Sequence, residues 1–288
     1  MKAPAKKTFG KGMILPVVVA AAVVCFGSLN RVEGQIYTLT DNNSMAQVDV
    51  GSQAGMFNWS INMPDGSWQN QLNQQWFWYR IGSTPEQSID TISPAVVLQP
   101  NTRTLISTYA NNQLTLQVTY LLSGGSVASG ISDIGETISI KNTGSTPLSF
   151  SFFQYSDFNL EGVLGDQKVT LGKNLRGLWN EAFQEKMTNG YGLTETVTTP
   201  GANHGEAAIF NSTLVKLNDG VADNLNDNAV SAVGNATWAL QWDFYIPVGG
   251  SAIISKDKYI RVPPVPEPSA VALVGFGLLG WLLRRRSV

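Results

Sequence analysis

The chain has 288 residues, of which 43% are hydrophobic, with a single cysteine and a single histidine. Its net charge of −2 conceals two basic ends, because residues 29–262 hold 12 basic and 20 acidic side chains, a charge of about −8. An acidic segment without basic clusters excludes nucleic acid as a partner. Cys25 lies in the N-terminal apolar run, so we expect no disulfide and no cysteine metal site after it.

The first element in chain order has the features of a secretory signal. Four lysines come before an apolar run at residues 13–26, and the small residues Gly27 and Ser28 follow it. About 14 apolar residues suit the core of a signal peptide and fall short of the ~20 that span a bilayer. We therefore predict a signal peptide over residues 1–28 and export through the Sec translocon. An uncleaved N-terminal anchor is the alternative.

Residues 29–262 show repeated alternation of apolar and polar side chains, which is typical of half-buried strands. Strands are predicted at 56–61, 75–81, 104–109, 114–122, 238–246 and 252–260. A turn-forming loop separates 136–142 from 148–155, and this pattern predicts a β-hairpin. Helical spacing is clearest at 213–225. The sequence therefore predicts an all-β fold, a single antiparallel β-sandwich-like domain over residues 29–262 with one short helix.

Four aromatic residues are consecutive in one predicted strand, from Trp76 through Phe77 and Trp78 to Tyr79. Because side chains alternate along a strand, two of them face the core and two face the other way. Exposed aromatic rings suit stacking on sugars, so Trp76, Trp78 and Tyr79 are candidate ligand-binding residues. The alternative is that both faces of this strand are covered and the rings fill the core.

Carboxylates are the candidates for any hydrolytic chemistry, because glycosidases use a pair of them. Asp157 and Glu161 follow an aromatic strand and would serve a carbohydrate-active enzyme. The alternative is that both are solvated, as acidic residues at the end of a strand usually are. We assign no catalytic residue and predict a non-enzymatic protein.

Metal ligands of the usual kinds are scarce. His204 has no second histidine or exported cysteine to join it, and no Gly-x-Ser-x-Gly sequence supports a serine triad. Residues 218–228 offer many oxygen ligands for calcium, but Val221 and Leu225 occupy positions where donors are required. We predict a solvent-exposed histidine, a polar loop, and neither a cofactor nor a metal site.

The end of the chain combines a proline-rich linker, an apolar segment and three arginines over residues 263–288. Residues 269–283 carry no charge, and as a helix they would reach ~22 Å against a hydrocarbon core of ~30 Å. The arginines should stay on the cytoplasmic side, which places residues 29–262 outside. We predict a short transmembrane helix at 269–283. The alternative is a buried core helix, but it would leave three arginines at the chain end with no structural role.

The ordered set of Pro266, Glu267 and Pro268, the glycine-containing apolar segment and Arg284, Arg285 and Arg286 resembles the PEP-CTERM sorting signal of bacteria. The resemblance implies processing by an exosortase-type enzyme, with membrane attachment through the C-terminal helix before processing. It also implies placement in the cell envelope, at the outer surface or in the extracellular matrix, with adhesion or scaffolding on extracellular polysaccharide. The same tail occurs on some ice-binding proteins, but the Thr-x-Thr pairs at 38–40, 102–104 and 194–196 share no period, which argues against ice binding.

Overall fold

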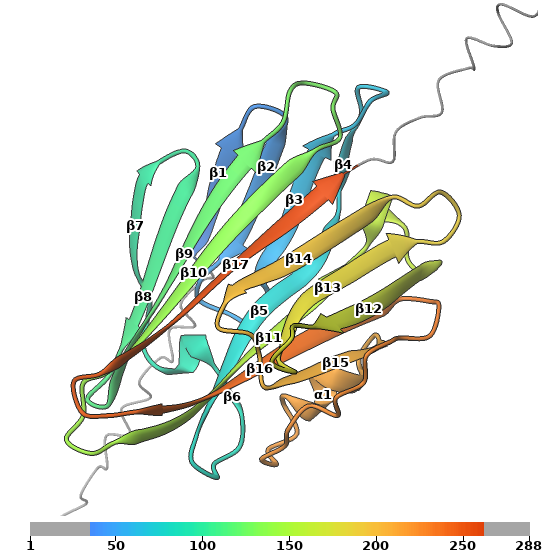
Figure 1. Cartoon of the computed structure of the whole chain (residues 1–288). Helices are drawn as coiled ribbons and strands as arrows, with labels where there is room; N and C mark the ends of the chain where they lie inside the picture. The colour runs from blue at the N-terminus through green and yellow to red at the C-terminus, as the bar shows by residue number, and fades with distance from the viewer. Residues whose placement is uncertain (1–34, 262–288) are drawn as a thin grey trace, which may run out of the picture. The chain divides into compact units, whose positions relative to one another are not determined.

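Two stacked β-sheets form the described part of the chain, residues 35–261 of a computed structural model (Figure 1). The predicted signal peptide and sorting tail lie outside these residues. The nine-stranded sheet contains, in spatial order, β1 (Ile36–Asp41), β2 (Ser44–Asp49), β3 (Gly55–Asn62), β5 (Leu72–Ile81), β11 (Leu148–Phe158), β16 (Ala236–Ile246) and β15 (His204–Ile209). The short strands β4 (Trp68–Asn70) and β6 (Gln87–Ser88) pair with β3 and β5.

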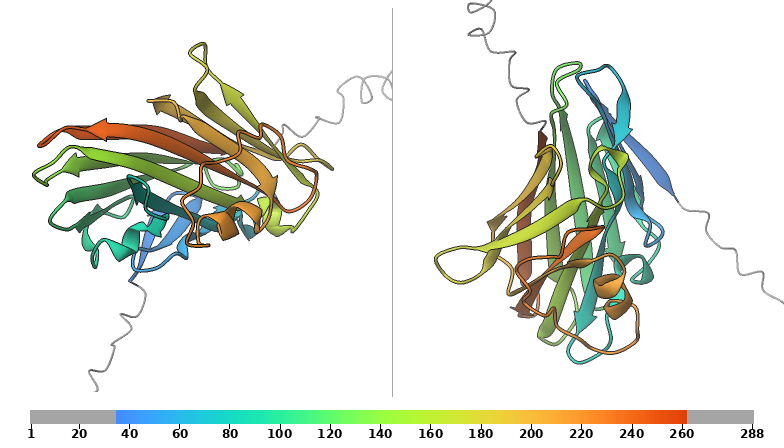
Figure 2. Two further views of the ribbon diagram at one scale, coloured as in Figure 1. Left: turned by 90° about the horizontal axis from the view of Figure 1, so that it is seen from below. Right: turned by 90° about the vertical axis from the view of Figure 1, so that its right-hand side faces the viewer.

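The eight-stranded sheet lies over the first one, as the end-on views show (Figure 2). Its spatial order is β12 (Gln167–Lys173), β13 (Trp179–Lys186), β14 (Gly192–Thr199), β17 (Ser251–Arg261), β10 (Ser132–Asn142), β9 (Leu114–Gly124), β8 (Thr104–Ala110) and β7 (Val96–Asn101). Pairing is antiparallel except at a short contact between β3 and β5. The predicted all-β sandwich is therefore confirmed. No helix within residues 35–261 is long and apolar enough to cross a membrane.

The predicted hairpin at 136–155 is wrong, because its two strands belong to different sheets. β10 pairs with β9 and β17, whereas β11 pairs with β5 and β16. The loop between them does not form hairpin hydrogen bonds. Instead, the amides of Thr143 and Gly144 donate to the carbonyl of Gln113. Both strands bury alternate side chains in the same interlayer core. The apolar pattern is therefore equally compatible with a connection that crosses from one sheet to the other.

The predicted helix at 213–225 is much shorter in the structure. Helix α1 covers Ser212–Lys216, and two short 3-10 turns occur at Ile89–Thr91 and Leu160–Gly162. Beyond α1 the chain is irregular, and Gly220 adopts a φ of +79°, which lies in the left-handed region that favours glycine. The spaced leucines of this segment therefore pack without a continuous helix.

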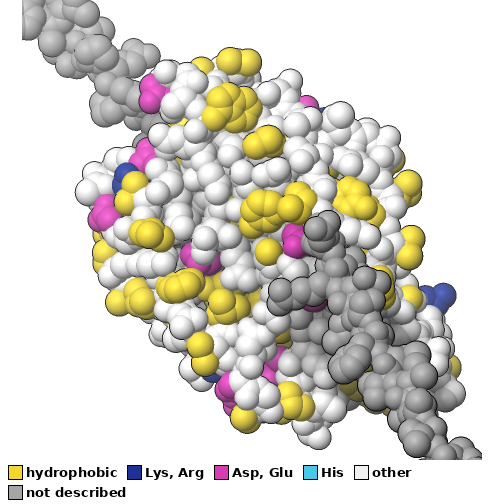
Figure 3. All heavy atoms as spheres, turned by 180° about the vertical axis from the view of Figure 1, so that it is seen from behind, with side chains coloured by type: hydrophobic (Ala, Val, Ile, Leu, Met, Phe, Trp, Pro, Cys, Tyr) yellow, Lys and Arg dark blue, Asp and Glu magenta, His cyan; other side chains and the backbone are white. Residues whose placement is uncertain are grey.

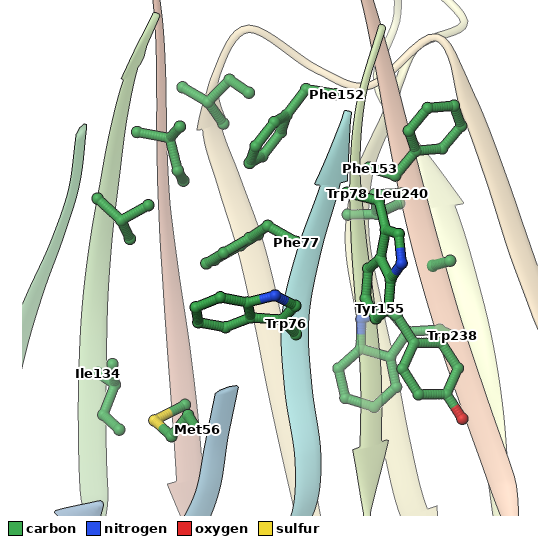
Figure 4. Close-up of a cluster of buried hydrophobic side chains, with 14 of the residues drawn as sticks. Met56, Trp76, Phe77, Trp78, Ile134, Phe152, Phe153, Tyr155, Trp238 and Leu240 are labelled. Carbon is green, nitrogen blue, oxygen red and sulfur yellow. The ribbon is translucent and has the colours of Figure 1, made fainter. Parts of the chain in front are cut away.

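Aromatic rings from β5, β11 and β16 fill the space between the sheets (Figure 4). Phe77 stacks on Phe152 with ring centroids 5.4 Å apart and meets Tyr120 of the opposite sheet at 6.5 Å. Trp238 stacks on Phe158 at 5.3 Å. Large rings of this kind bury 150–250 Å² each, so these contacts dominate the apolar stabilisation.

Two lysines and two glutamates also lie between the sheets, with no exposed side-chain surface. Lys258 Nζ lies 2.9 Å from Glu136 Oε2, and Lys256 Nζ also contacts Glu136. Glu195 accepts hydrogen bonds from the Gln154 amide at 2.6 Å and from the Trp238 indole at 3.2 Å. Burial, followed by the charge of Lys258, lowers the pKa of Lys256. The charges balance in number, as buried ions require.

Residues 211–228 form what we call the cover segment, which lies against the outer face of the nine-stranded sheet. Its contacts with that sheet are polar and well defined. Arg80 Nη1 donates to the carbonyl of Asp223 at 2.7 Å, and Lys216 Nζ pairs with Glu206 at 2.7 Å. The Thr213 hydroxyl donates to Glu206 at 2.7 Å as well. As a result, β5, β11 and β16 are buried on both faces along most of their length.

Candidate functional site

A groove of about 450 Å³ lies over β9, β10, β14 and β17 in the middle of the eight-stranded sheet. Its lining combines hydroxyl groups with a carboxylate on an exposed strand surface: Thr119, Thr137, Thr198, Ser255 and Asp257, together with Leu121 and Gly135. Within residues 35–261 no segment comparable to the cover segment shields these positions, which are partly or fully exposed. Glu136 and Lys256 also belong to the lining, but their side chains are buried between the sheets. This groove is the candidate site.

The strand register explains why the groove is open. Gly135 of β10 lies opposite Asp257 of β17, and Thr137 lies opposite Ser255. A Cβ atom at Gly135 would meet Asp257 Oδ1 at 3.9 Å, an ordinary contact distance. The absence of a side chain at Gly135 therefore leaves the space beside the Asp257 carboxylate free for a ligand.

Asp133 and Asp257 form a carboxyl pair at one end of the groove. Burial, followed by the negative charge of Asp257 and a hydrogen bond to it, raises the pKa of Asp133 to about 7. Two carboxyl groups in hydrogen-bond contact cannot both ionise without repulsion, so near neutral pH they share a proton. The pair can then donate one hydrogen bond and accept several.

Aromatic side chains lie in the same cross-strand row as Asp133. Phe183 of β13, Thr194 of β14, Tyr259 of β17 and Asp133 of β10 are successive cross-strand partners and form one row across the sheet. Phe183 is 37% exposed and Tyr259 is 38% exposed. The outer face of this sheet thus presents carboxyl, hydroxyl and aromatic groups side by side.

The aromatic residues predicted to bind a ligand lie elsewhere and are buried. Trp76 and Trp78 have no exposed surface, and Tyr79 is 7% exposed. Figure 4 shows Phe77 and Trp78 on opposite sides of β5. Trp78 Nε1 donates to Asn218 of the cover segment at 3.3 Å. In this arrangement no indole of β5 is open to a sugar, so the predicted stacking requires the cover segment to move.

Asp157 and Glu161 each bond to other side chains. Asp157 is buried, its Oδ2 accepts a hydrogen bond from Asn73 at 2.7 Å, and burial raises its pKa to about 6. Glu161 instead pairs with Lys186 at 2.6 Å and also accepts from Asn189. Asp157 is therefore neither solvated, as expected for the end of a strand, nor part of the groove.

His204 lies at the start of β15 and is held between two carboxylates. Its Nδ1 is 2.9 Å from Asp227 and its Nε2 is 3.7 Å from Asp243. Burial raises the pKa of Asp227, but hydrogen bonds from His204 and Trp179 outweigh this effect and lower it. In the described part of the chain, no group of three or more histidine, cysteine or acidic side chains is arranged to hold a metal ion. His204 thus helps to fix the cover segment to β15.

The residues of the groove were missed by sequence reasoning. Asp133 and Asp257 are 124 positions apart, and only the pairing of β10 with β17 brings them together. A partial signal existed, because Asp257 and Tyr259 fall on the face of the 252–260 strand opposite Ile254 and Ile260, the side chains expected to point into the core. The sorting residues Pro266, Glu267, Pro268 and Arg284 to Arg286 lie outside the described residues.

Residues 264–286 match the family described as the PEP-CTERM protein-sorting motif, which confirms the motif predicted from the sequence. The chain therefore carries the signal of an exported, surface-sorted protein with a C-terminal membrane-held tail before processing. No curated protein sequence matches the chain.

Among solved structures, the fold is similar to that of a bacterial glucoamylase complexed with acarbose, with a TM-score of 0.55 and 8% identity. That match covers 84% of this chain but 36% of the glucoamylase. A galactose mutarotase related enzyme from Lactobacillus acidophilus matches with a TM-score of 0.54 and 8% identity, over 80% of this chain and all of that one. A galactose mutarotase-like protein from Clostridium acetobutylicum matches with a TM-score of 0.51 and 8% identity, over 80% of this chain and 96% of that one. At this identity the similarity shows a shared fold, one that enzymes also use.

Proposed function

We propose that this protein is an exported polysaccharide-binding protein of the cell envelope or extracellular matrix, and that it holds a glycan in the groove of the eight-stranded sheet. One observation carries the proposal. A carboxyl pair, a set of hydroxyl groups and two half-exposed aromatic rings lie together on one open strand face. A sugar ring presents hydroxyl groups and an apolar face of C–H bonds, and it needs both kinds of partner.

The charge of the groove narrows the class of glycan. Asp133 and Asp257 carry about one negative charge near neutral pH, because they share a proton. An anionic polysaccharide such as a uronate polymer would be repelled by this charge, whereas neutral sugars and amino sugars would not. The carboxyl oxygens can accept hydrogen bonds from sugar hydroxyls or from an ammonium group. The proposed ligand is therefore a neutral or amino-sugar-containing polysaccharide.

The structural neighbours give limited support in the same direction. Their names describe a glucoamylase bound to acarbose and galactose mutarotase-related proteins, which act on or bind carbohydrates. The identity of 8% carries the fold and no residue roles. For this chain, carbohydrate binding rests on the groove itself.

A carboxylate-dependent enzyme is the second candidate, and the Asp133–Asp257 pair is the observation that favours it. Glycosidases hold their two carboxyl groups ~5 Å or ~6.5–9.5 Å apart, and a hydrogen-bonded pair is closer than either distance. The arrangement therefore suits binding better than glycosidic hydrolysis. Release of reducing ends from a bound polysaccharide, lost in Asp257→Asn, would favour the enzyme.

Affinity electrophoresis of the purified protein tests the binding proposal. Gels would contain galactomannan, dextran, partially deacetylated chitosan or alginate. We expect retardation by at least one of the first three and none by alginate, with at least ~5-fold weaker retention for Tyr259→Ala and Asp257→Asn. Tyr245→Ala is the matched control, because Tyr245 is 75% exposed on β16 of the other sheet. Equal retention of all variants, or no retention in any gel, would contradict the proposal.

We further propose that an exosortase-type enzyme processes the tail near Pro266–Pro268 after export through the Sec translocon. The matched sorting motif supports this order of events. Mass spectrometry of the mature protein should find a C-terminus before the apolar segment 269–283 and an N-terminus near residue 28. A mature protein that keeps residues 269–288 would instead be a permanently anchored surface protein.

A further inference from the structure

The outer face of the nine-stranded sheet is not covered everywhere. Over β1, β2, β3 and β4 it carries a second groove of about 290 Å³, lined by Thr40, Asn42, Ser44, Met45, Ser60 and Trp68. Trp68 lies on the short strand β4 and is 55% exposed. Large apolar rings on a protein surface are informative when they border a concavity, because water there is displaced more readily by a ligand.

The strand register shows how this groove is built. Thr40, Met45 and Ser60 are successive cross-strand partners in β1, β2 and β3. Trp68 pairs with Asn62, which lies two residues after Ser60 in β3 and on the same face. As a result, its indole closes the row at the β4 end. The indole therefore stands beside a short ladder of hydroxyl and thioether side chains.

The surface that continues from this row is polar and uncharged. Ser60 donates to Asn58 at 2.7 Å, and the Asn58 amide donates to Gln47 at 3.2 Å. No charged side chain belongs to the lining of this groove as far as residues 35–261 are concerned. A binding surface made of one indole, hydroxyls and amides offers no partner for a charged ligand and suits a neutral one.

The setting of Trp68 differs from that of other exposed apolar residues. Figure 3 shows the molecule from the side of the nine-stranded sheet, where hydrophobic side chains are scattered over a mainly uncharged polar surface. Scattered exposure of this kind is normal for a soluble domain. Unlike residues exposed singly, Trp68 borders a groove, as Leu121 does on the eight-stranded sheet.

We propose that the Trp68 groove is a second saccharide site, specific for neutral glycans, and that the protein is therefore a bivalent cross-linker of polysaccharide. The site itself stands on the Trp68 groove alone, whereas the bivalency rests on the proposed function of the groove at Asp257. The two grooves lie on the outer faces of different sheets, whose mean planes in a sandwich are ~10 Å apart. Two glycan strands can occupy them at once, one on each side.

Bivalency changes the physical result of binding. A protein with one groove coats a polymer, whereas a protein with two opposed grooves joins two polymer strands. Once one groove is occupied, the second sees a high local concentration of sugar within a network, so overall retention exceeds that of either groove alone. This property suits a scaffolding role in a matrix.

The experiment measures binding and cross-linking on the same set of variants. Affinity electrophoresis in galactomannan or dextran reports binding, and dynamic light scattering of the dissolved polymer reports cross-linking. The variants are Trp68→Ala, Tyr259→Ala, their combination, the conservative Trp68→Phe and the control Tyr245→Ala. We expect the wild type, Trp68→Phe and Tyr245→Ala to increase the apparent size of the polymer at least ~3-fold.

Each single variant should still bind one polymer, with at least ~5-fold weaker retention, but should no longer increase its size. The double variant should not bind. Cross-linking by Trp68→Ala at the wild-type level, with loss only in Tyr259→Ala, would overturn the second site and leave the first. Loss in Trp68→Ala with no effect of Tyr259→Ala would overturn the first site and the bivalency, but would leave the Trp68 site. The absence of binding by the wild type to galactomannan and dextran would overturn the Trp68 site and the bivalency, and the absence of binding to partially deacetylated chitosan as well would also overturn the first site.

Discussion

The outer faces of the two sheets differ in what lies over their central strands. On the nine-stranded sheet the cover segment packs over β5, β11 and β16, and Trp76 and Trp78 are fully buried. On the eight-stranded sheet no other part of residues 35–261 covers β9, β10 and β17, Asp257 lines an open groove, and Tyr259 is 38% exposed on the same face. The more aromatic of the two faces is therefore the covered one. Whether a face can bind a ligand depends on the segment that packs over it, and not on the number of aromatic rings that the face carries.

The two faces also use charge differently. The covered face uses buried ion pairs to hold its cover, chiefly Arg80 with Glu86 at 2.7 Å and Lys216 with Glu206. The open face places two like charges together and moderates their repulsion by keeping a proton. Charge therefore holds the structure together on one side and leaves a reactive, hydrogen-bonding surface on the other.

Removal of the main anchor of the cover should have the largest effect. In Arg80→Ala, Glu86 loses its ion-pair partner in a site where its side chain is 2% exposed, and Asp223 and Asn224 lose their hydrogen-bond donor. Breaking a buried pair from one side typically costs about 3–5 kcal/mol. We expect a loss of this size in the free energy of unfolding, measured by urea denaturation.

The matched control is Arg103→Ala, which removes the same chemistry from the surface. Arg103 is 51% exposed in its side chain and lies 3.9 Å from Asp41. Exposed pairs contribute ~0–1 kcal/mol, so the free energy of unfolding should change by less than about 1 kcal/mol. Similar losses in the two variants would show that the cover segment is not anchored through Arg80.

Filling the open groove should have the next largest effect. Gly135→Leu places a side chain beside Asp257 in the space that we assign to the glycan. We expect at least ~10-fold weaker binding to the polysaccharide that retards the wild type, which corresponds to about 1.4 kcal/mol. Lys141→Leu introduces the same side chain on the same face of β10, outside the groove, and should bind like the wild type. If isothermal titration gives equal affinities for the two variants, the ligand does not occupy this groove.

The smallest effect concerns pH and separates the open face from the covered one. Because the pKa of Asp133 is raised from 3.8 to about 7 in the folded protein, the folded state binds this proton more tightly than the unfolded state. The resulting stabilisation is complete below pH ~4 and is lost as the pH rises towards 7. Asp133→Asn removes this term.

After allowance for partial solvent exposure, we expect the term to be about 1 kcal/mol. The free energy of unfolding of the wild type should therefore fall more steeply than that of Asp133→Asn between pH 5 and pH 8. Parallel profiles would mean that folding does not raise the pKa of Asp133. Asp157, whose pKa is raised to about 6 by burial, contributes with the same sign in both proteins and cancels in the comparison.

Much of the fold could be predicted because strand periodicity is a local property. The alternation at 114–122 and 238–246 corresponds to β9 and β16, and the strand at 252–260 to β17. The hairpin failed because the loop at 143–147 forms its hydrogen bonds with Gln113, a distant residue. The helix at 213–225 failed because its leucines pack on the sheet without needing helical geometry beyond Lys216.

The candidate site could be predicted much less well, for a physical reason. Its carboxyl pair depends on the register between β10 and β17, which local sequence does not determine. The run from Trp76 to Tyr79 is aromatic, yet it is buried: Phe77 packs on Tyr120 of the other sheet, and Trp78 bonds to Asn218 of the cover segment. Trp68 was passed over because it stands alone on a three-residue strand. Exposure, which distinguishes these tryptophans, is a tertiary property.

A glycan that lies over β9, β10 and β17 should protect the backbone amides of these strands. Hydrogen–deuterium exchange of the purified protein measures this protection directly. The exchange would be measured with and without the polysaccharide that retards the wild type. We predict slower exchange in peptides that contain residues 119–121, 135–137 and 255–257, and no change in peptides from β11 and the cover segment. Protection confined to β5, β11 and the cover segment, with none over the groove, would contradict the account.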